Sequence, residues 1–371
     1  MIGKDVAGII YSSNYDNYLT ELTAVRTMGS VPFGGRYRLV DFVLSSMVDF
    51  GVSKVAVAMC NNYRSLMDHI GNGRPWDLAR KREGLFMLPP YNFSGVGAYG
   101  SKMSMLRGAE DFLNHTKEEY ILVTDCNVVC NLDIEKLAAF HAENGADITL
   151  AYAKGKLPQL PDTAVLKLGD DASVTEMEIS PKDTEEGAFA VNIMLLKKSL
   201  LLRLIHEASA HGWKDFDRDI LMRNPGSLKI CGYEIPGFCR VIDSLQSYYD
   251  ISISLLDKAA RDALFCEERP VLTRVRDDMP TVYGIGSSVK NSLIADGCVI
   301  EGTVENSVLS RGVRVEKGAV VKNCVLMQET FISSGATANC VITDKNVVLR
   351  PGKTLSGAEN YTLFISKGKV I

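Results

Sequence analysis

The stretch Val31-Pro-Phe-Gly-Gly-Arg-Tyr-Arg-Leu-Val-Asp-Phe42 decides how the N-terminal part of this chain is interpreted. Apolar residues recur from its end at helical spacing, at Leu39, Val43, Met47 and Phe50, and Gly51 stands where a helix would end. The spacing therefore predicts an amphipathic helix over 39–50.

The segment before this stretch, Ile10-Tyr-Ser-Ser-Asn-Tyr-Asp-Asn-Tyr-Leu19, contains no glycine. Backbone N–H groups that approach a triphosphate need glycines, because a Cβ atom blocks close approach and the loop must adopt positive φ values. Asp16 would also repel a phosphate. We therefore expect no phosphate-binding loop here.

Short apolar strands alternate with helical patterns over the first two thirds of the chain, which is typical of an α/β sheet with crossover helices. Ligands in such sheets bind beyond the carboxyl ends of the strands, so the segment 11–18 and Asp125 should share one cleft. Besides the helix above, we expect strands at Val6–Tyr11, Lys54–Met59 and Tyr120–Thr124, and a second helix at Ser104–Leu113.

A repeated unit appears in the last quarter of the chain. Each copy begins with Asn and continues with apolar residues, and the starts lie 15, 17 and 16 residues apart, at Asn291, Asn306, Asn323 and Asn339. Such a period fits the coils of a β-helix, in which each coil buries its inner face against the next. The exposed final coil would be a natural surface for oligomerisation. An antiparallel sandwich of short strands is the alternative.

Composition excludes several classes of protein. The chain has 371 residues, 46% of them apolar and 23% charged, which is enough for two domains with a large core. No apolar run approaches the roughly 20 residues of a membrane helix. The net charge of −4, without a long basic block, argues against nucleic acid as a partner. The nine scattered cysteines indicate buried thiols in a reducing cytoplasm.

The block 31–42, the stretch 63–70 and the tail from 288 to 318 resemble bacterial glucose-1-phosphate adenylyltransferase (ADP-glucose pyrophosphorylase) over nearly the whole chain. Within that family the chain is most similar to the GlgD-type non-catalytic or regulatory subunits. The resemblance implies an α/β fold, with a nucleotidyltransferase-type (Rossmann-like) mixed sheet covered by helices on both faces, followed by a left-handed parallel β-helix. We expect a nucleotidyltransferase-like domain over 1–260, a linker over 261–287 and the β-helix over 288–371.

The family reaction joins ATP to glucose 1-phosphate, releases pyrophosphate and uses Mg²⁺. By resemblance, Asp125 matches the first metal carboxylate, and Val241 stands where the second should be. Asp243 is a possible substitute carboxylate, because residues i and i+2 of a strand share a face. One carboxylate rarely holds a catalytic Mg²⁺, so we expect none bound by this chain alone. Asp125 could equally be an ordinary residue at the end of a strand.

The resemblance also implies substrate-binding positions that are retained at Arg26, Arg36, Gly100 and Ser101. Both arginines could instead be surface or ion-pairing residues. Other contact positions of the family have lost their chemistry, at Met28, Cys60, Met103, Ile179 and Ser180.

Tyrosines accompany these losses in the segment 11–18. Tyr11, Tyr15 and Tyr18 would either fill the emptied nucleotide cleft or offer a stacking surface to another subunit. We favour filling of the cleft, because an emptied polar pocket would otherwise contain unsatisfied groups.

An intact fold pattern beside a dismantled reaction centre favours a regulatory subunit of glycogen biosynthesis. We expect it to assemble through its β-helix with a catalytic subunit, in a cytoplasmic heterotetramer, with ATP or a sugar phosphate as a possible effector. Three alternatives stay open: a weakly active adenylyltransferase that uses Asp125 and Asp243, a β-helix acyltransferase, and a self-associating structural protein. The acyltransferase is disfavoured because the repeat region has no histidine base. Whether the chain is an enzyme stays open at this stage.

Overall fold

Strand β1 (Val6–Tyr11) forms where the sequence predicts it, and it lies inside the main sheet of this computed structural model, which describes residues 1–89, 101–182, 184–223 and 227–371. It pairs in parallel with β4 (Lys54–Ala58) on one side and β6 (Tyr120–Asp125) on the other. All six residues of β1 are buried, as expected for a parallel strand covered on both faces.

The main sheet is mixed. Its order is β10-β9-β11-β6-β1-β4-β5, with β8 beside β11 and β12 beside β8. The long strand β11 (Glu186–Lys197) runs antiparallel to β6 and β8, and it therefore joins the parallel part to an antiparallel arm. The remaining strands of the α/β domain are β2 Pro32–Phe33, β3 Tyr37–Arg38, β5 Gly84–Leu88, β7 Val128–Cys130, β8 Ile148–Lys156, β9 Ala164–Leu168, β10 Val174–Ile179, β12 Ile230–Glu234 and β13 Cys239–Val241.

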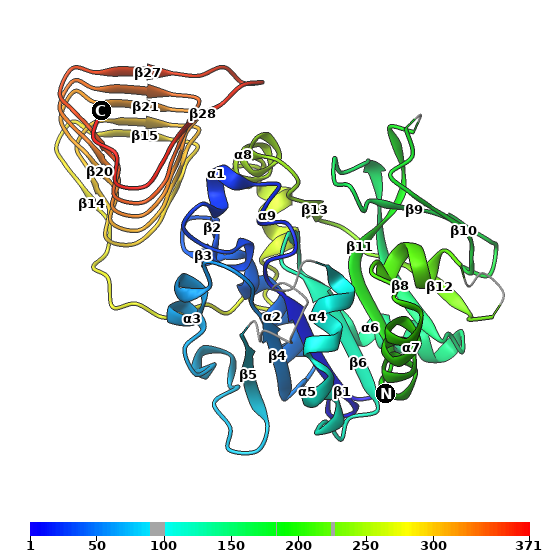
Figure 1. The fold of residues 1–371 in the computed structure, drawn as a ribbon. Helices are drawn as coiled ribbons and strands as arrows, with labels where there is room; N and C mark the ends of the chain where they lie inside the picture. Colours follow the sequence, from blue (N-terminus) through cyan, green and yellow to red (C-terminus); the bar gives the residue numbers. More distant parts are fainter. Residues whose placement is uncertain (90–100, 183, 224–226) are drawn as a thin grey trace.

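Helices cover both faces of this sheet (Figure 1). Alternate residues of β1 supply the two apolar clusters: Val6 and Ile10 pack with α2 and α6, whereas Ala7 and Ile9 pack with α4, α5 and α7. The helices are α1 Thr20–Thr23, α2 Leu39–Asp49, α3 Arg64–Ile70, α4 Lys102–Gly108, α5 Glu110–Asn114, α6 Ile134–Glu143, α7 Lys198–His211, α8 Leu245–Ser254 and α9 Lys258–Leu264. Shorter helical turns are η1 Gly3–Asp5, η2 Met28–Ser30, η3 Arg74–Trp76 and the π-helical η4 Asp217–Leu221.

One predicted helix differs from the structure. The single helix expected over 104–113 is two helices, α4 and α5, which meet at Gly108 and Ala109. Glycine disfavours the interior of a helix, which ends α4 at Gly108, and the N-cap Ser101 starts α4 at Lys102. The start of α4 therefore lies at the carboxyl edge of the sheet, where Lys102 becomes important below.

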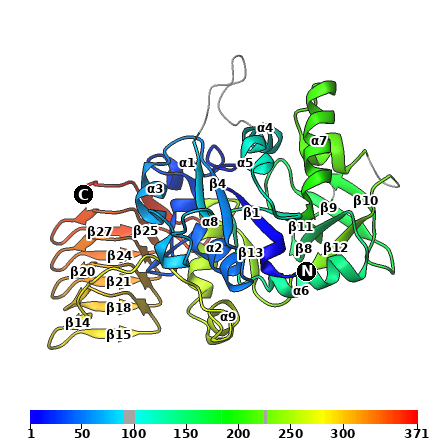
Figure 2. The same cartoon turned by 90° about the horizontal axis from the view of Figure 1, so that it is seen from below.

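The last quarter of the chain is a left-handed parallel β-helix, and the sandwich alternative is wrong. Three parallel sheets, each of five short strands, run through the stacked coils (Figure 2). Their inward residues form a separate apolar core. The strands are β14 Val282–Tyr283, β15 Ser288–Lys290, β16 Leu293–Ile294, β17 Val299–Ile300, β18 Thr303–Glu305, β19 Val308–Leu309, β20 Arg314–Val315, β21 Val320–Lys322, β22 Val325–Leu326, β23 Phe331–Ile332, β24 Thr337–Asn339, β25 Val341–Thr343, β26 Val348–Leu349, β27 Thr354–Ser356 and β28 Leu363–Ile365.

The repeat asparagines form corners of the coils, with one correction. Asn291, Asn306 and Asn323 have φ values of 41°, 47° and 50°, in the left-handed region that Asn tolerates. The fourth corner is Cys340, φ 50°, and not Asn339, because Val325 pairs with Ile342. The coil repeat at this step is therefore 17 residues and not 16.

The β-helix packs against the α/β domain through a third apolar cluster. This cluster joins Leu19, just before α1, and Leu22, within α1, to three residues of the coils: Val325, Met327 and Ile342. Helix α8 lies at the same boundary (Figure 1), where the Tyr249 hydroxyl donates to the carbonyl oxygen of Asn323 at 2.7 Å. Within the described residues, no helix is both long and apolar enough to cross a membrane.

Candidate functional site

Asp125 ends β6 and is 2% exposed, at the carboxyl edge of the parallel strands. Its carboxylate accepts a hydrogen bond from the Asn14 side-chain amide at 3.1 Å, so the segment after β1 closes directly over it. Burial raises the pKa of Asp125 to about 7, against the opposing attraction of Lys102. The prediction that these two segments share one cleft is confirmed.

A lysine occupies the centre of this cleft. The Lys102 ammonium donates to Asp217 Oδ2 at 2.7 Å and to Asn192 Oδ1 at 2.9 Å. The side chains of Lys102 and Asp217 are 10% and 9% exposed, so the ion pair is buried. Helix α4 brings the lysine, β11 the amide and η4 the carboxylate.

The hydrogen-bond network continues through Tyr15 to the other wall of the cleft. The Asn192 amide donates to the Tyr15 hydroxyl, and that hydroxyl donates to Asp162 Oδ2 at 2.9 Å. Tyr15 is 2% exposed. Burial, reinforced by Asp125, raises the pKa of this hydroxyl well above its ordinary value. A continuous network of side chains therefore spans the space where a ligand would lie.

Asn192 adopts an unusual backbone conformation to make these contacts. Its φ value is 56°, and the pairing of β11 with β8 shifts register between Ala190 and Ile193. A bulge of this kind re-aims a side chain, and non-glycine residues with positive φ gather at functional sites. The strand thus bends to turn one amide toward Lys102 and Tyr15.

Little volume remains in the cleft. The space lined by Lys102, Asp125, Asn192 and Asp217 amounts to about 20 Å³. The adjoining space, lined by Tyr15, Asp162 and Val241, amounts to about 10 Å³. Each is large enough for about one water molecule and far too small for a nucleotide.

Asp16, in the glycine-free segment 10–19, accepts hydrogen bonds from one backbone N–H group and one hydroxyl. Its Oδ1 accepts from the Met28 N–H at 2.7 Å and from the Thr27 hydroxyl at 3.3 Å. Burial raises the pKa of this carboxyl to about 7. The Met28 N–H is therefore already bonded to this carboxylate and does not point to a free site.

Asp243 lies in a different place from Asp125. Its carboxylate accepts from the Gln159 N–H at 2.7 Å and from the Ser244 hydroxyl at 3.0 Å. It lines a groove of about 700 Å³ between the end of β8 and α8, and Val241 lines both this groove and the filled cleft. Among the described residues no contact joins Asp125 to Asp243, so their pairing at one metal stays a prediction.

The structure places the predicted substrate-binding residues in varied settings. Ser101 caps α4, where its hydroxyl accepts from the Ser104 N–H at 3.2 Å. Arg36 is exposed and lies 5.7 Å from the ring centre of Tyr37. Gly100 lies outside the described residues. Their roles toward a substrate stay predictions.

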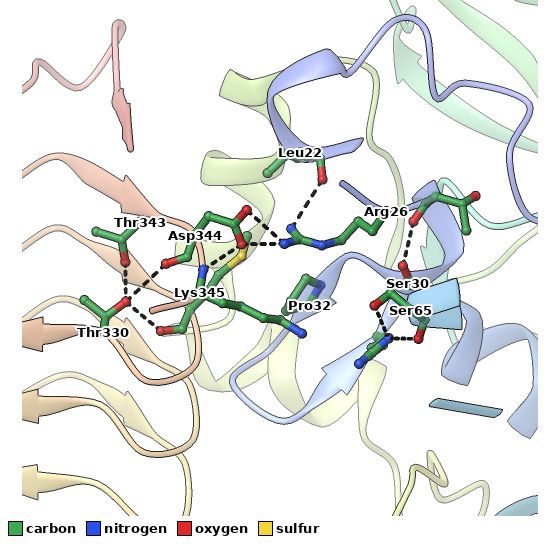
Figure 3. Close-up of polar contacts among 12 residues, drawn as sticks. Leu22, Arg26, Ser30, Pro32, Ser65, Thr330, Thr343, Asp344 and Lys345 are labelled. Carbon is green, nitrogen blue, oxygen red and sulfur yellow. Dashed lines mark hydrogen bonds and ion pairs between the residues drawn. The ribbon is translucent and has the colours of Figure 1, made fainter. Parts of the chain in front are cut away.

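Arg26, the fourth predicted substrate-binding residue, forms a buried ion pair with the β-helix. Its Nη2 lies 2.6 and 2.8 Å from the two carboxylate oxygens of Asp344, and both side chains are at most 3% exposed. Figure 3 shows the pair at the domain boundary, with the carbonyl oxygen of Leu22 as a further acceptor. This matches the ion-pairing alternative from the sequence.

Further cationic side chains lie near that ion pair. Lys345 extends from the β-helix toward Pro32 and Ser65 (Figure 3), and no described acceptor lies within bonding distance of its Nζ. Burial, reinforced by Arg38 and Arg26, lowers the pKa of Lys345 to about 7. Arg38 donates to the carbonyl oxygen of Ser65 at 2.6 Å. Positive charge at this boundary is therefore only partly compensated.

Sequence reasoning missed Lys102, Asn192, Asp162 and Asp217. A signal existed for two of them: Lys102 is a charge beside an apolar helical run, and Asn192 interrupts the apolar run of β11. Asp162 and Asp217 carry no local signal, because their partners lie far away in sequence.

Two family models match the chain. A nucleotidyl transferase model matches residues 8–219, which is more than half of the chain. A GlmU-like, C-terminal hexapeptide model matches residues 281–360.

Full-length relatives agree with these matches. The glycogen biosynthesis protein GlgD of Geobacillus stearothermophilus is 38% identical and that of Bacillus subtilis 34% identical, each over all of this chain and 98% of the relative. A glucose-1-phosphate adenylyltransferase of Clostridium perfringens is 28% identical over 99% of this chain and 95% of the relative.

Proposed function

The chain belongs to the nucleotidyl transferase family, in its group of GlgD glycogen biosynthesis proteins, and we propose that it is a regulatory subunit with little or no catalytic activity of its own. Its role is to support ADP-glucose synthesis by a catalytic subunit of glucose-1-phosphate adenylyltransferase. The relatives' names support a part in glycogen synthesis, and the regulatory part rests on the cleft.

The filled cleft carries this proposal. Adenylyl transfer needs donors for a triphosphate, a cation held by carboxylates, and contacts to a sugar phosphate. Here the space left is about 20 Å³, and Asn192 at its wall bonds to both Lys102 and Tyr15. Loss of one preorganised charge-stabilising group costs about 3 kcal/mol, or roughly a hundredfold in rate. Loss of several leaves little chemistry, although such losses do not add.

The bare first coil of the β-helix supports assembly. β14, β15 and β16 are each the outermost strand of a sheet. Tyr283 of β14 is 56% exposed, and Met279 and Ile285 on either side of this strand are 80% and 103% exposed. At the opposite end, the chain's own last residues pair with β26. The occupant we propose for the first coil is the first coil of a catalytic subunit's β-helix, because a strand edge of the same kind would offer matching unpaired N–H and C=O groups.

The cationic cluster at the domain boundary supports an anionic effector, either ATP or a sugar phosphate. Arg38 and Arg26 repel the Lys345 ammonium there, and Asp344 is its counter-charge. An anion bound among these cationic side chains would restore the charge of the lysine and contact both domains at once. A coupling of about 1 to 3 kcal/mol would change a partner's ligand affinity roughly five- to 150-fold.

The deciding experiment measures Mg²⁺-dependent pyrophosphate release from ATP and glucose 1-phosphate. It compares this chain alone, the catalytic subunit of the same organism alone, and their mixture. We expect no turnover by this chain and a raised rate or an altered effector response in the mixture. Robust turnover by this chain alone would contradict the proposal, and Asp125→Asn together with Asp243→Asn would then test those carboxylates.

A further inference from the structure

The filled cleft contains more acids than cations. Asp125, Asp162 and Asp217 all belong to it, and Lys102 is the cationic side chain among the described residues that line it. Acids buried together need a counter-charge, and in the family reaction that charge is Mg²⁺. These buried acids therefore need a source of positive charge, either a metal ion or a side chain of the protein.

The donor set does not fit a divalent metal. Within the described residues, no group of three or more His, Cys, Asp or Glu side chains is arranged to hold a metal ion. Asp125 already accepts from Asn14, Asp162 from Tyr15, and Asp217 from Lys102. One oxygen of each carboxylate thus has a separate internal partner, and Asp162 Oδ1 has none among the described residues.

The lysine is held as a cation. Burial alone lowers the pKa of Lys102, but the attraction of Asp217, Asp125 and Asp162 outweighs it and leaves the pKa above its ordinary value. The ammonium is also fixed in position, since Asp217 and Asn192 both accept from it. A permanent positive charge therefore stands among these carboxylates.

We propose that Lys102 is a built-in cation that takes the place of the divalent metal, so that the cleft has a counter-charge without Mg²⁺ and excludes it. A dication beside a fixed ammonium would meet like-charge repulsion in a medium that screens charge poorly. Octahedral Mg²⁺ would also require several ligand oxygens in a space for about one water molecule. The inference rests on the proposed regulatory function and assigns that function a residue.

The test uses Mn²⁺ as a spectroscopic probe for Mg²⁺ and the full chain without its partner. Electron paramagnetic resonance counts bound Mn²⁺, and thermal unfolding reports stability with and without Mg²⁺. We expect the wild type to bind no Mn²⁺ in the cleft and to show no change of Tm with Mg²⁺. Lys102→Met should lower the Tm by about 5–10 °C, because it leaves Asp217 buried without its partner.

The Lys102→Met variant should also gain the Mn²⁺ binding that the wild type lacks. With the ammonium removed, Mn²⁺ should bind at least about tenfold more tightly than to the wild type, and Mg²⁺ should restore part of the lost Tm. Lys102→Arg keeps the charge and should exclude Mn²⁺ as the wild type does. If Lys102→Met does not fold, Lys102→Met with Asp217→Asn removes the uncompensated charge and should fold without binding Mn²⁺.

Lys167→Met is the matched control: the side chains of Lys167 and its partner Glu176 are 61% and 56% exposed, so loss of this ion pair should change the Tm by less than about 2 °C. Mn²⁺ bound by the wild type and lost in Asp125→Asn would overturn the inference, and so would an unchanged Mn²⁺ affinity in Lys102→Met. Neither result would touch the regulatory proposal, which fails only on pyrophosphate release by the chain alone.

Discussion

Asn192 is the residue on which the filled cleft depends most directly. Its side chain bonds to both Lys102 and Tyr15, and its φ value of 56° lies in the left-handed region, which Asn tolerates and most other residues with a Cβ atom do not. Two separate contributions, the hydrogen bonds and the backbone conformation, can therefore be measured at one position.

We predict that Asn192→Gly lowers the free energy of unfolding by about 1–3 kcal/mol, because it removes two buried hydrogen bonds while tolerating the backbone. Asn192→Ala should cost about 1 kcal/mol more, since alanine resists positive φ. Urea unfolding of both variants measures the two values.

Asn346 provides the matched control for Asn192. It has a φ value of 58°, is exposed, and its side chain has no hydrogen bond among those described. Asn346→Gly should therefore change stability by less than about 0.5 kcal/mol. An equal cost of glycine at both positions would show that the cleft network contributes nothing.

Lys345 makes the stability of the fold depend on pH. Its pKa is about 7 in the folded chain, against 10.5 as its ordinary value, so between these values the unfolded chain binds more protons. Stability therefore rises with pH across this window and reaches a constant low level below pH 7. From pH 7 to 9 we expect Lys345 to contribute a rise of up to about 2 kcal/mol, which urea unfolding at each pH would measure.

Lys345→Met should flatten that rise and stabilise the chain at pH 7, because it removes an ammonium that Arg38 and Arg26 repel. Lys353→Met, an exposed lysine of the same domain, should leave the pH dependence unchanged. Addition of ATP should raise the Tm of the wild type more at pH 6.5 than at pH 8.5. If the free energies of unfolding of the wild type and of Lys345→Met both fall in parallel from pH 7 to 9, Lys345 is not the source of the pH dependence.

At the scale of elements, the two ends of the β-helix differ. The last coil is partly closed by the chain's own end, where the Ile371 N–H donates to the carbonyl oxygen of Val348 at 2.9 Å. The first coil has no such cover in the described chain, and Ile285 on it is fully exposed. The sequence predicts oligomerisation at the final coil, whereas these exposures favour the first.

We predict that Ile285→Asp weakens association with the catalytic subunit at least about tenfold, because it places a charge in an apolar contact. Sedimentation of the mixture measures the loss, and the Tm of the isolated chain should not change, because the side chain contacts solvent.

Tyr361→Asp is the control at the other end, where the side chain is 81% exposed. It should leave association unchanged. The reverse pattern, with Tyr361→Asp disruptive and Ile285→Asp silent, would return the assembly surface to the final coil.

At the scale of the whole molecule, one buried ion pair ties the two domains together. Arg26 and Asp344 are 318 positions apart, and each is the buried partner of the other. Removal of one partner leaves an uncompensated charge, which typically costs about 3–5 kcal/mol. Replacement of both by apolar residues is often close to neutral.

We therefore predict that Arg26→Met destabilises the chain by about 3–5 kcal/mol and that Arg26→Met with Asp344→Leu recovers most of this loss. Calorimetry of the single and double variants measures the coupling. Gln246→Ala removes an exposed contact to Glu359 across the same boundary and should cost less than about 1 kcal/mol. If the costs of Arg26→Met and Asp344→Leu simply add in the double variant, the ion pair does not couple the domains.

The sequence by itself determined the elements and their order. Apolar spacing located β1 and α2, and the repeat located the β-helix, because these patterns reflect neighbours within a few residues or one coil. The absence of glycine between Ile10 and Leu19 likewise predicts that this segment does not form a phosphate loop. It also placed Asp125 and the segment after β1 at one edge, because the carboxyl ends of parallel strands meet there.

Only the tertiary structure decided which charges meet. Lys102 finds Asp217 across 115 positions, and Arg26 finds Asp344 across 318, so no local pattern specifies either pair. The one-residue change at the corner of Cys340 also follows from pairing between coils and not from the likeness of the units. A buried charge is stabilised by whichever partner the fold brings within about 3 Å, and that partner is set by packing of the whole chain.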